Sequence, residues 1–269
     1  MCKVLKLSRS SYYALQKKKP GKWEIENTAI KKEIICIYIS SKRRYGAHKI
    51  HKSLLKKGTK VSLKRTQRLM KELNVASITV KKYKPVSSKS DVSDRVNILN
   101  RNFHTTGINE KWATDTTYIH TQQDGWCYLS VVMDLYSRKI IGQAFSRRID
   151  TALALSALDN AMIARKITKS LILHSDRGSQ FTSNDYQNYI LGTELIHHSF
   201  SAKGCPYDNA GIESFFSILK REEVSKKIYR NYHEARLSIF EFIESWYNLN
   251  RIHSSLNYLT PNEMELLVA

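Results

Sequence analysis

The order of apolar segments in the second half of the chain limits the fold most strongly. Three strand-like segments follow one another with short gaps, at residues 112–119, 126–136 and 139–146, and Asp124-Gly125 favours a hairpin turn between the first two. Helical and strand patterns then alternate, with helices at 151–165 and near 183–191, strands at 170–174 and 194–199, and a helix that opens near Asp208 and runs past Lys220. This order predicts an α/β fold with a mixed sheet, its first three strands antiparallel, covered by helices.

The first quarter of the chain is predicted to be helical. Apolar side chains recur at helical spacing over residues 27–40 and 46–57, Gly58 breaks the second pattern, and Ser62 can cap a third helix to about Leu73. Three helices with a glycine turn before the third indicate a helix-turn-helix, whose third helix enters the major groove of DNA. Helical hairpins with lysines also occur in proteins that never touch DNA. The basic side chains that would face DNA are Lys64, Arg65, Arg68 and Lys71.

The distribution of charge separates the chain into two parts. The formal net charge is +20, but residues 1–110 carry 27 Lys and Arg against 7 Asp and Glu, whereas residues 111–269 carry 17 of each. A basic region joined to an electrically balanced one suggests a part that grips double-stranded DNA and a part with another task. A charge run taken alone is equally compatible with a well-solvated surface.

Cysteine content and hydropathy exclude several classes of protein. The four cysteines are widely separated and lack a C-x-x-C pair, so the sequence indicates neither a structural zinc site nor a disulfide framework. No apolar run approaches the roughly 20 residues that cross a bilayer, and the lysine-rich start lacks the apolar core of a signal peptide. We expect a cytoplasmic protein with no membrane partner.

Three acidic residues stand out by their place in the predicted elements. Asp115 lies within a strand, where a charge is costly unless it is paired or bound to a metal. Asp176 follows the apolar strand at 170–174, and Glu213 falls in the first turns of a helix. Each also has a structural explanation: Asp115 could pair with an arginine, Asp176 could cap a turn, and Glu213 could favour a helix N-terminus.

Together, the three carboxylates could converge at one edge of the sheet and hold magnesium, which prefers oxygen ligands. Two ions about 4 Å apart would suit in-line displacement at phosphorus. Lys220 lies seven residues after Glu213, about 20° away around the helix, so it could hold a DNA phosphate beside the ions. His174 shares a strand face with Asp176 and is expected to support the site, whereas Asp134, just before a turn, is interpreted as structural.

The motifs that contain these residues resemble those of a known family. They are residues 111–119 around Asp115, residues 174–183 around Asp176, residues 207–216 with Asn209 and Glu213, and Tyr247-Asn248 with residues 251–261. They look like the bacterial insertion-sequence transposases of the family typified by insertion sequence three, relatives of retroviral integrases. Upstream, Tyr45-Gly46 and residues 61–70 look like that family's second helix-turn-helix module, so the resemblance covers nearly the whole chain.

The resemblance implies a ribonuclease H-like catalytic core of the retroviral integrase type, with a D-D-E triad at Asp115, Asp176 and Glu213 and with Asn209 as a supporting residue. It further implies two Mg²⁺ or Mn²⁺ ions, nicking at the element ends, strand transfer by the freed 3′-hydroxyl, and a homo-oligomer on terminal inverted repeats and target DNA. We therefore expect a helical DNA-binding region at 1–75, a linker at 76–108, the core at 109–225 and a C-terminal helical extension at 226–269.

Two departures from the family pattern shape the remaining expectations. The segment between Asp176 and Glu213 is one residue longer than is usual, and a loop near Gly192 could absorb the insertion. The chain looks like the downstream-frame (OrfB-type) protein alone, so an upstream-frame (OrfA-type) protein is a candidate partner. The alternatives are another ribonuclease H-like nuclease, such as a junction resolvase, and a non-catalytic DNA-binding regulator or incomplete transposase subunit.

Overall fold

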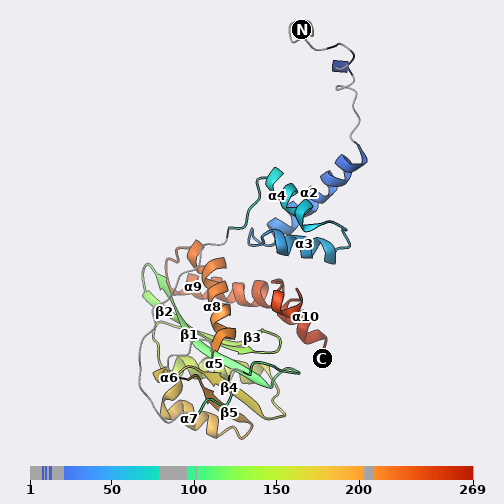
Figure 1. Cartoon of the computed structure of the whole chain (residues 1–269). Helices are drawn as coiled ribbons and strands as arrows, with labels where there is room; N and C mark the ends of the chain where they lie inside the picture. The colour runs from blue at the N-terminus through green and yellow to red at the C-terminus, as the bar shows by residue number, and fades with distance from the viewer. Residues whose placement is uncertain are drawn as a thin grey trace. The chain divides into compact units, whose positions relative to one another are not determined.

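The chain folds into two compact units, Met1–Ile78 and Thr79–Ala269. The computed structural model describes residues 21–78, 96–100, 102–202 and 209–268, together with Ser8, Ser10, Tyr12 and Tyr13 (Figure 1). Most of the proline-containing part of the predicted linker, and Tyr207-Asp208 before the last core helix, lie outside the described residues. Within the described residues, no helix is both long and apolar enough to span a lipid bilayer.

The first unit contains the three predicted helices, α2 (Lys22–Ser40), α3 (Ala47–Lys56) and α4 (Leu63–Glu72). The Ser62 hydroxyl accepts a hydrogen bond from the Arg65 backbone N–H at 3.2 Å, so Ser62 is the N-cap of α4, as predicted. The apolar faces meet in a small core in which these side chains are buried: Ile30, Ile34, Ile37, Ile50, Leu54, Leu69 and Met70.

The second unit is built on one five-stranded sheet. Its strands are β1 (Lys111–Thr121), β2 (Gly125–Asp134), β3 (Ile140–Ser146), β4 (Leu171–Ser175) and β5 (Ile196–Phe200). The order across the sheet is β3-β2-β1-β4-β5, with β1, β2 and β3 antiparallel and with β4 and β5 parallel to β1. The predicted mixed sheet, including its three antiparallel strands, is confirmed.

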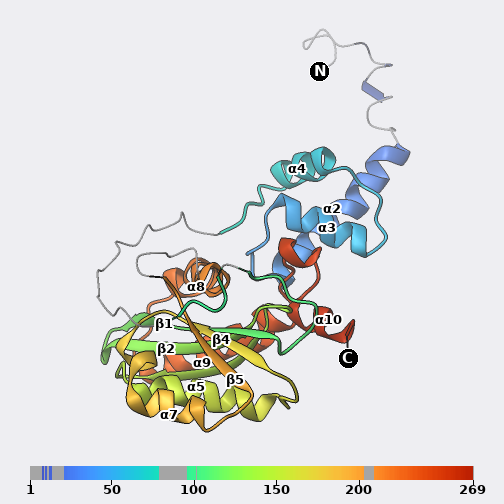
Figure 2. The same ribbon diagram turned by 60° about the horizontal axis from the view of Figure 1, so that its bottom comes forward.

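Helices cover both faces of this sheet (Figure 2). On one face, α5 (Thr151–Ala164), the short α6 (Ser179–Thr182) and α7 (Asn184–Leu191) enclose a core with Trp112, Leu171 and Leu173 of the strands. A Cβ atom on Gly142 of β3 would lie 2.2 Å from the Ala157 backbone oxygen, so only glycine permits the close approach of α5. On the opposite face lies α8 (Ala210–Glu222), in the position predicted for the last core helix.

The predicted C-terminal extension is helical, but its first helix changes type along its length. The helix α9 (Tyr232–Glu241) passes directly into a π-helical stretch, Phe242–Asn248, in which most side chains are buried. There the Asn248 side chain accepts a hydrogen bond from the Ile140 backbone N–H and donates one to its carbonyl oxygen, both at 3.0 Å. The wider π turn brings this amide to the edge of β3, a long-range contact that periodicity does not reveal.

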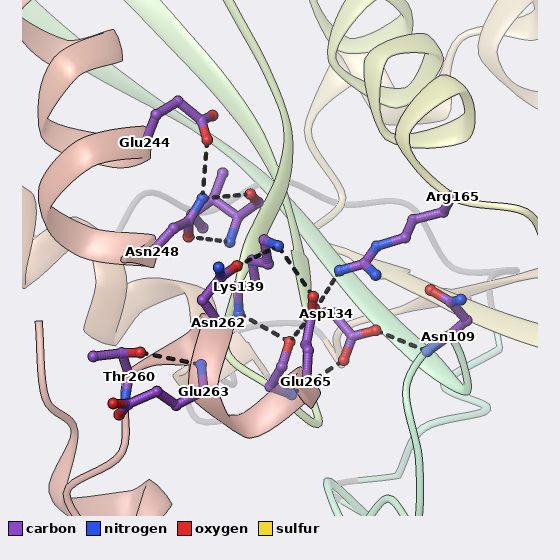
Figure 3. A network of polar contacts seen from close by, with 12 residues as sticks. Asn109, Asp134, Lys139, Arg165, Glu244, Asn248, Thr260, Asn262, Glu263 and Glu265 are labelled. Carbon is purple, nitrogen blue, oxygen red and sulfur yellow. Dashed lines mark hydrogen bonds and ion pairs between the residues drawn. The ribbon is translucent and has the colours of Figure 1, made fainter. Parts of the chain in front are cut away.

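The last helix, α10 (Pro261–Leu266), is held to the sheet by a polar network (Figure 3). The Glu265 carboxylate accepts from Lys139 Nζ at 3.1 Å, from the Ser137 hydroxyl at 2.8 Å, and from the Arg165 guanidinium. Thr260 and Glu263 form a capping box that begins the helix. The C-terminal residues are therefore an integral part of the second unit. A short 3₁₀ turn on each side of α9, Val224–Lys226 and Ser254–Leu256, completes the elements.

Candidate active site

Strand register brings the first two predicted carboxylates to the same level of the sheet. β1 and β4 pair in parallel only over residues 111–113 and 172–174, with Ala113 opposite His174. Continuing that register by two residues places Asp115 level with Asp176, which directly follows β4. Side chains two residues apart share a face, so both carboxylates project from the same side of the sheet where the two strands separate.

The third carboxylate, Glu213, and the predicted lysine, Lys220, both lie on α8 on that side of the sheet. The pKa of Asp115 is raised well above its ordinary value by burial and by the negative charges of Asp176 and Glu213. The Thr116 backbone N–H, which donates to Asp115 Oδ1 at 2.7 Å, and the ammonium of Lys220 act in the opposite direction. The structure therefore brings Asp176, Glu213 and Lys220 within electrostatic reach of Asp115.

The surroundings of the carboxylates differ from one another. Asp115 and Asp176 are half-buried, whereas Glu213 is exposed at the start of α8. Burial raises the pKa of Asp176, and the Gly178 backbone N–H, which donates to Asp176 Oδ1 at 2.9 Å, partly offsets this effect. Burial lowers the pKa of Lys220, and the nearby Asp115 carboxylate opposes that shift. Such pKa shifts in neighbouring titratable groups are characteristic of catalytic sites.

The ligand chemistry of this cluster fits a hard divalent cation. All of its donors are carboxylate oxygens, which suit Mg²⁺ or Mn²⁺, and a bound cation would offset the repulsion that raises the pKa of Asp115. Within the described part of the chain, no group of three or more His, Cys, Asp or Glu side chains lies close enough together to hold a metal ion. Asp115, Asp176 and Glu213 are all described, so the structure does not bring these three carboxylates close enough together to hold an ion as a trio.

The two predicted supporting residues, His174 and Asn209, are both buried. His174 is two residues before Asp176, and Asn209 is four residues before Glu213. The ring nitrogens of His174 contact the hydroxyls of Ser199 and Ser201 at 3.0 and 3.1 Å, so the imidazole joins β4 to the end of β5. Asn209, only 5% exposed, is the N-cap residue of α8. Among the described residues, its side-chain oxygen and nitrogen have no hydrogen-bond partner.

Asp134, the competing acidic residue, lies at the end of β2 and is fully buried. Its carboxylate accepts hydrogen bonds from the backbone N–H groups of Asn109 at 2.8 Å, Tyr136 at 2.8 Å and Ser137 at 3.2 Å (Figure 3). Burial raises its pKa, and these three donors oppose that shift. This geometry matches the interpretation of Asp134 as a residue that organises the turn after β2.

The predicted DNA-contacting side chains of the helical unit fall into two groups. Lys64, Arg68 and Lys71 are exposed on α4. Arg65 is half-buried, and its guanidinium donates to Glu26 Oε1 at 2.9 Å and to Asn27 Oδ1 at 3.0 Å. These contacts hold α4 against α2, a role that helical spacing alone did not reveal because the partners come from another helix.

Sequence reasoning also missed a buried ion pair behind α8. Arg251 donates to the Glu222 carboxylate through Nη2 at 2.9 Å and Nε at 3.1 Å, and the Trp246 indole N–H donates to it at 3.1 Å. Glu222 is nine residues after Glu213, or half a turn around the helix, so the pair holds the face opposite the site. The sequence signal that could have revealed this pair is the position of a charged residue, Glu222, on the apolar side of the predicted helix.

Comparison with protein families identifies known domains in both units. An integrase core domain family matches residues 105–206, a second integrase core domain family matches residues 194–261, and an HTH-like domain family matches residues 24–83. The fold and the matched domains define a protein of the integrase class, with a ribonuclease H-like core of the polynucleotidyl-transferase type and an N-terminal HTH-like domain.

Similar proteins narrow this class to one family. The chain is 35% identical to the transposase InsF for insertion sequence IS3A of Escherichia coli (strain K12), over 98% of this chain and 92% of that protein. It is 36% identical to the transposase for insertion sequence element IS904 of Lactococcus lactis subsp. lactis (strain IL1403), over 92% of this chain and 98% of that protein. The chain belongs to the insertion-sequence transposases of the family typified by insertion sequence three.

Comparison with solved structures gives matches of lower similarity. The HTLV-2 integrase catalytic core domain in complex with magnesium has 16% identity and a TM-score of 0.45, and the match covers 60% of this chain and 99% of that chain. A chain of the cryoEM structure of the simian T-cell lymphotropic virus intasome in complex with PP2A regulatory subunit B56 gamma has 15% identity and a TM-score of 0.47, over 82% of this chain and 70% of that chain.

Proposed function

We propose that this transposase cleaves DNA at the ends of its insertion sequence and joins the freed ends to target DNA, with Asp115, Asp176 and Glu213 as its catalytic residues. The observation that supports this most directly is that Asp115 and Asp176 lie at the same level of the sheet, with Glu213 on the neighbouring helix α8. Strand register aligns Asp115 with Asp176, and the negative charge of Glu213 contributes to the raised pKa of Asp115. An electrostatic cluster assembled from two strands and one helix is difficult to explain by turn or helix capping alone.

The chemistry proposed for this site is in-line displacement at phosphorus. Bound at the three carboxylates, two Mg²⁺ or Mn²⁺ ions would activate the attacking oxygen and stabilise the leaving oxygen. Asp115 and Asp176 would orient the attacking hydroxyl, first of water and then of the DNA 3′ end. Lys220, beside Asp115, would hold a phosphate oxygen and fix the strand for attack.

The remaining parts of the proposal concern partners. Lys64, Arg68 and Lys71 on α4 would contact phosphates or bases of the terminal inverted repeats, and Arg65 would position that helix. His174 and Asn209 would keep the site in shape. Two element ends must be handled together, so we propose a homo-oligomer on DNA, acting on the chromosome in the cytoplasm, with the upstream-frame protein as a second partner.

The decisive experiment compares the native chain with Asp176→Asn on labelled element-end DNA, with Mg²⁺ and with Mn²⁺. We expect divalent-dependent nicking and joining by the native chain and loss of both in the variant. Asp185→Asn, an exposed aspartate on α7, is the matched control and should keep both activities. Nicking without joining would identify a plain nuclease, and binding without cleavage by the native chain would identify a DNA-binding regulator or an incomplete subunit.

A further inference from the structure

A group of exposed aromatic rings lies beside the candidate active site on the β1–β2 hairpin. It consists of Tyr118, His120 and Trp126, which we call the aromatic platform. Tyr118 is 49% exposed and Trp126 is 53% exposed, and His120 is also exposed. The Trp126 ring contacts the Tyr118 ring edge-to-face at 5.1 Å between centroids and the His120 ring at 5.0 Å. Three rings thus form one continuous surface.

Strand geometry explains why the three rings lie together. Tyr118 and His120 are two residues apart on β1 and share a face, and Trp126 is directly opposite His120 in the antiparallel register with β2. This part of β1 lies beyond residues 111–113, the only ones that pair with β4. The platform therefore occupies the end of the hairpin that the central core does not cover, and large apolar surface left in water there indicates a binding partner.

A single lysine connects the platform to the candidate active site. The Lys220 Nζ atom lies 4.3 Å from the centroid of the Tyr118 ring, a cation–π contact, and the same ammonium is close enough to Asp115 to affect its ionisation. Along β1, Asp115 and Tyr118 are three residues apart, about 10 Å at the usual rise per residue, so their side chains leave the strand on opposite faces, and Lys220 is the group that approaches both. That separation corresponds to about three stacked nucleotides of one DNA strand.

We propose that the aromatic platform stacks against an unpaired nucleobase of the DNA strand whose phosphate lies at Asp115, Asp176 and Glu213. The inference rests on the proposed function, because it places that strand at the carboxylates. Exposed aromatic rings beside a cation suit single-stranded DNA, whose bases offer flat faces and whose phosphates carry negative charge. An unpaired base held in this way would keep the end of the element open and its backbone fixed for attack.

The position of Lys220 favours DNA over a protein as the occupant. Its ammonium closes one side of the platform with positive charge, and the neighbouring carboxylates are arranged for phosphodiester chemistry rather than for packing. A second copy of this chain offers no such complement, because its residues 1–110 are basic and its residues 111–269 carry 17 Lys and Arg against 17 Asp and Glu. The nucleobase and its phosphate complement both features at once.

The test uses the full chain carrying Asp176→Asn, so that binding is measured without turnover. The probe is element-end DNA forked at its terminus, with 2-aminopurine in the unpaired arm, compared with the same DNA fully paired. We expect saturable quenching of 2-aminopurine fluorescence with the fork. Adding Tyr118→Leu and Trp126→Leu together should abolish the quenching and weaken binding to the fork about tenfold, while binding to paired DNA stays unchanged.

The controls separate stacking from misfolding and from failure of the proposed function. Phe240→Leu, which removes another exposed ring of the same unit, 54% exposed on α9, should leave the quenching intact. The platform variants should keep the native melting temperature, because both side chains lie at the surface. Quenching that survives in Tyr118→Leu with Trp126→Leu would overturn the proposal, as would platform variants that change only the oligomeric state. Cleavage by Asp176→Asn would overturn the proposed catalytic role but would leave the stacking result readable.

Discussion

At the scale of single residues, the carboxylates of the site oppose their own ionisation. Burial and the charges of Asp176 and Glu213 raise the pKa of Asp115, and burial raises that of Asp176. A carboxyl group with a raised pKa in the folded state binds protons more readily when the chain is folded. It therefore contributes stability in acid that is lost as the pH rises from the ordinary carboxyl pKa toward the raised one. At neutral pH the cluster lowers the free energy of unfolding.

Replacing Asp115 tests this cost directly. Asp115→Asn removes the repelled charge, so we expect its melting temperature at neutral pH to exceed that of the native chain by a few degrees, with the difference shrinking in acid. Adding Mg²⁺ should stabilise the native chain and not the variant, because ligand binding to the folded state raises stability. Thermal unfolding between about pH 4 and pH 8, with and without Mg²⁺, measures both effects. A lower melting temperature for the variant at neutral pH would contradict the electrostatic account.

At the scale of elements, α8 is the part of the site that depends on the C-terminal extension. Glu213 and Lys220 lie toward the strands, while Glu222 is buried half a turn away and bound by Arg251 and Trp246. The extension that carries these partners is itself fastened to β3 through Asn248 and to the turn after β2 through Glu265 (Figure 3). The C-terminal extension thus holds α8 in position over β1 through contacts on the side of the helix that faces away from the carboxylates.

Breaking the ion pair behind α8 should reduce catalysis as well as stability. Arg251→Met leaves the Glu222 carboxylate buried without its cation, at a cost of about 3–5 kcal/mol, and the double variant with Glu222→Leu should regain much of it. We expect Arg251→Met to lower kcat for nicking with little change in KM for DNA, because α8 shifts while the DNA-gripping unit is intact. Arg236→Met, an exposed arginine on α9, is the control. An unchanged kcat per folded molecule would show that the pair only stabilises the fold.

The elements that sequence predicted well are those with a local signature. Alternation and apolar runs located all five strands, and the Ser62 cap located the start of α4 within a residue. The carboxylate set came from a motif resemblance, since each residue alone had a structural explanation. Contacts between distant segments were not predictable: the Asn248 bonds to β3, the Arg65 bonds to α2 and the serine partners of His174 depend on tertiary packing.

At the scale of the whole molecule, charge and chemistry reside in different units. The helical unit carries exposed lysines and arginines on α4, and the electrically balanced unit carries the carboxylate cluster. Affinity for DNA and the rate of the chemical step should therefore respond to different substitutions. The two units also have separate hydrophobic cores.

Salt dependence distinguishes the two roles assigned to basic residues of α4. Replacing Lys64, Arg68 and Lys71 together with alanine should weaken DNA binding and reduce the slope of log affinity against log salt by about 3, close to one per lost phosphate contact. Arg65→Ala should instead destabilise the helical unit, because it removes the bonds to Glu26 and Asn27. Binding titrations over a range of salt, with circular dichroism melts, measure both. An unchanged slope in the triple variant would place the DNA contacts elsewhere.

The register that aligns Asp115 with Asp176 decides where the gene can gain or lose a codon. A codon inserted between α7 and β5, near Gly192, lengthens a surface turn and leaves both aspartates where the backbone pairing puts them. A codon lost within the first residues of β1 would shift that strand by one position and turn Asp115 toward the face covered by α5. Copies of the element that gain or lose a codon should therefore encode an active transposase when the change falls in the turn, and an inactive one when it falls in the strand.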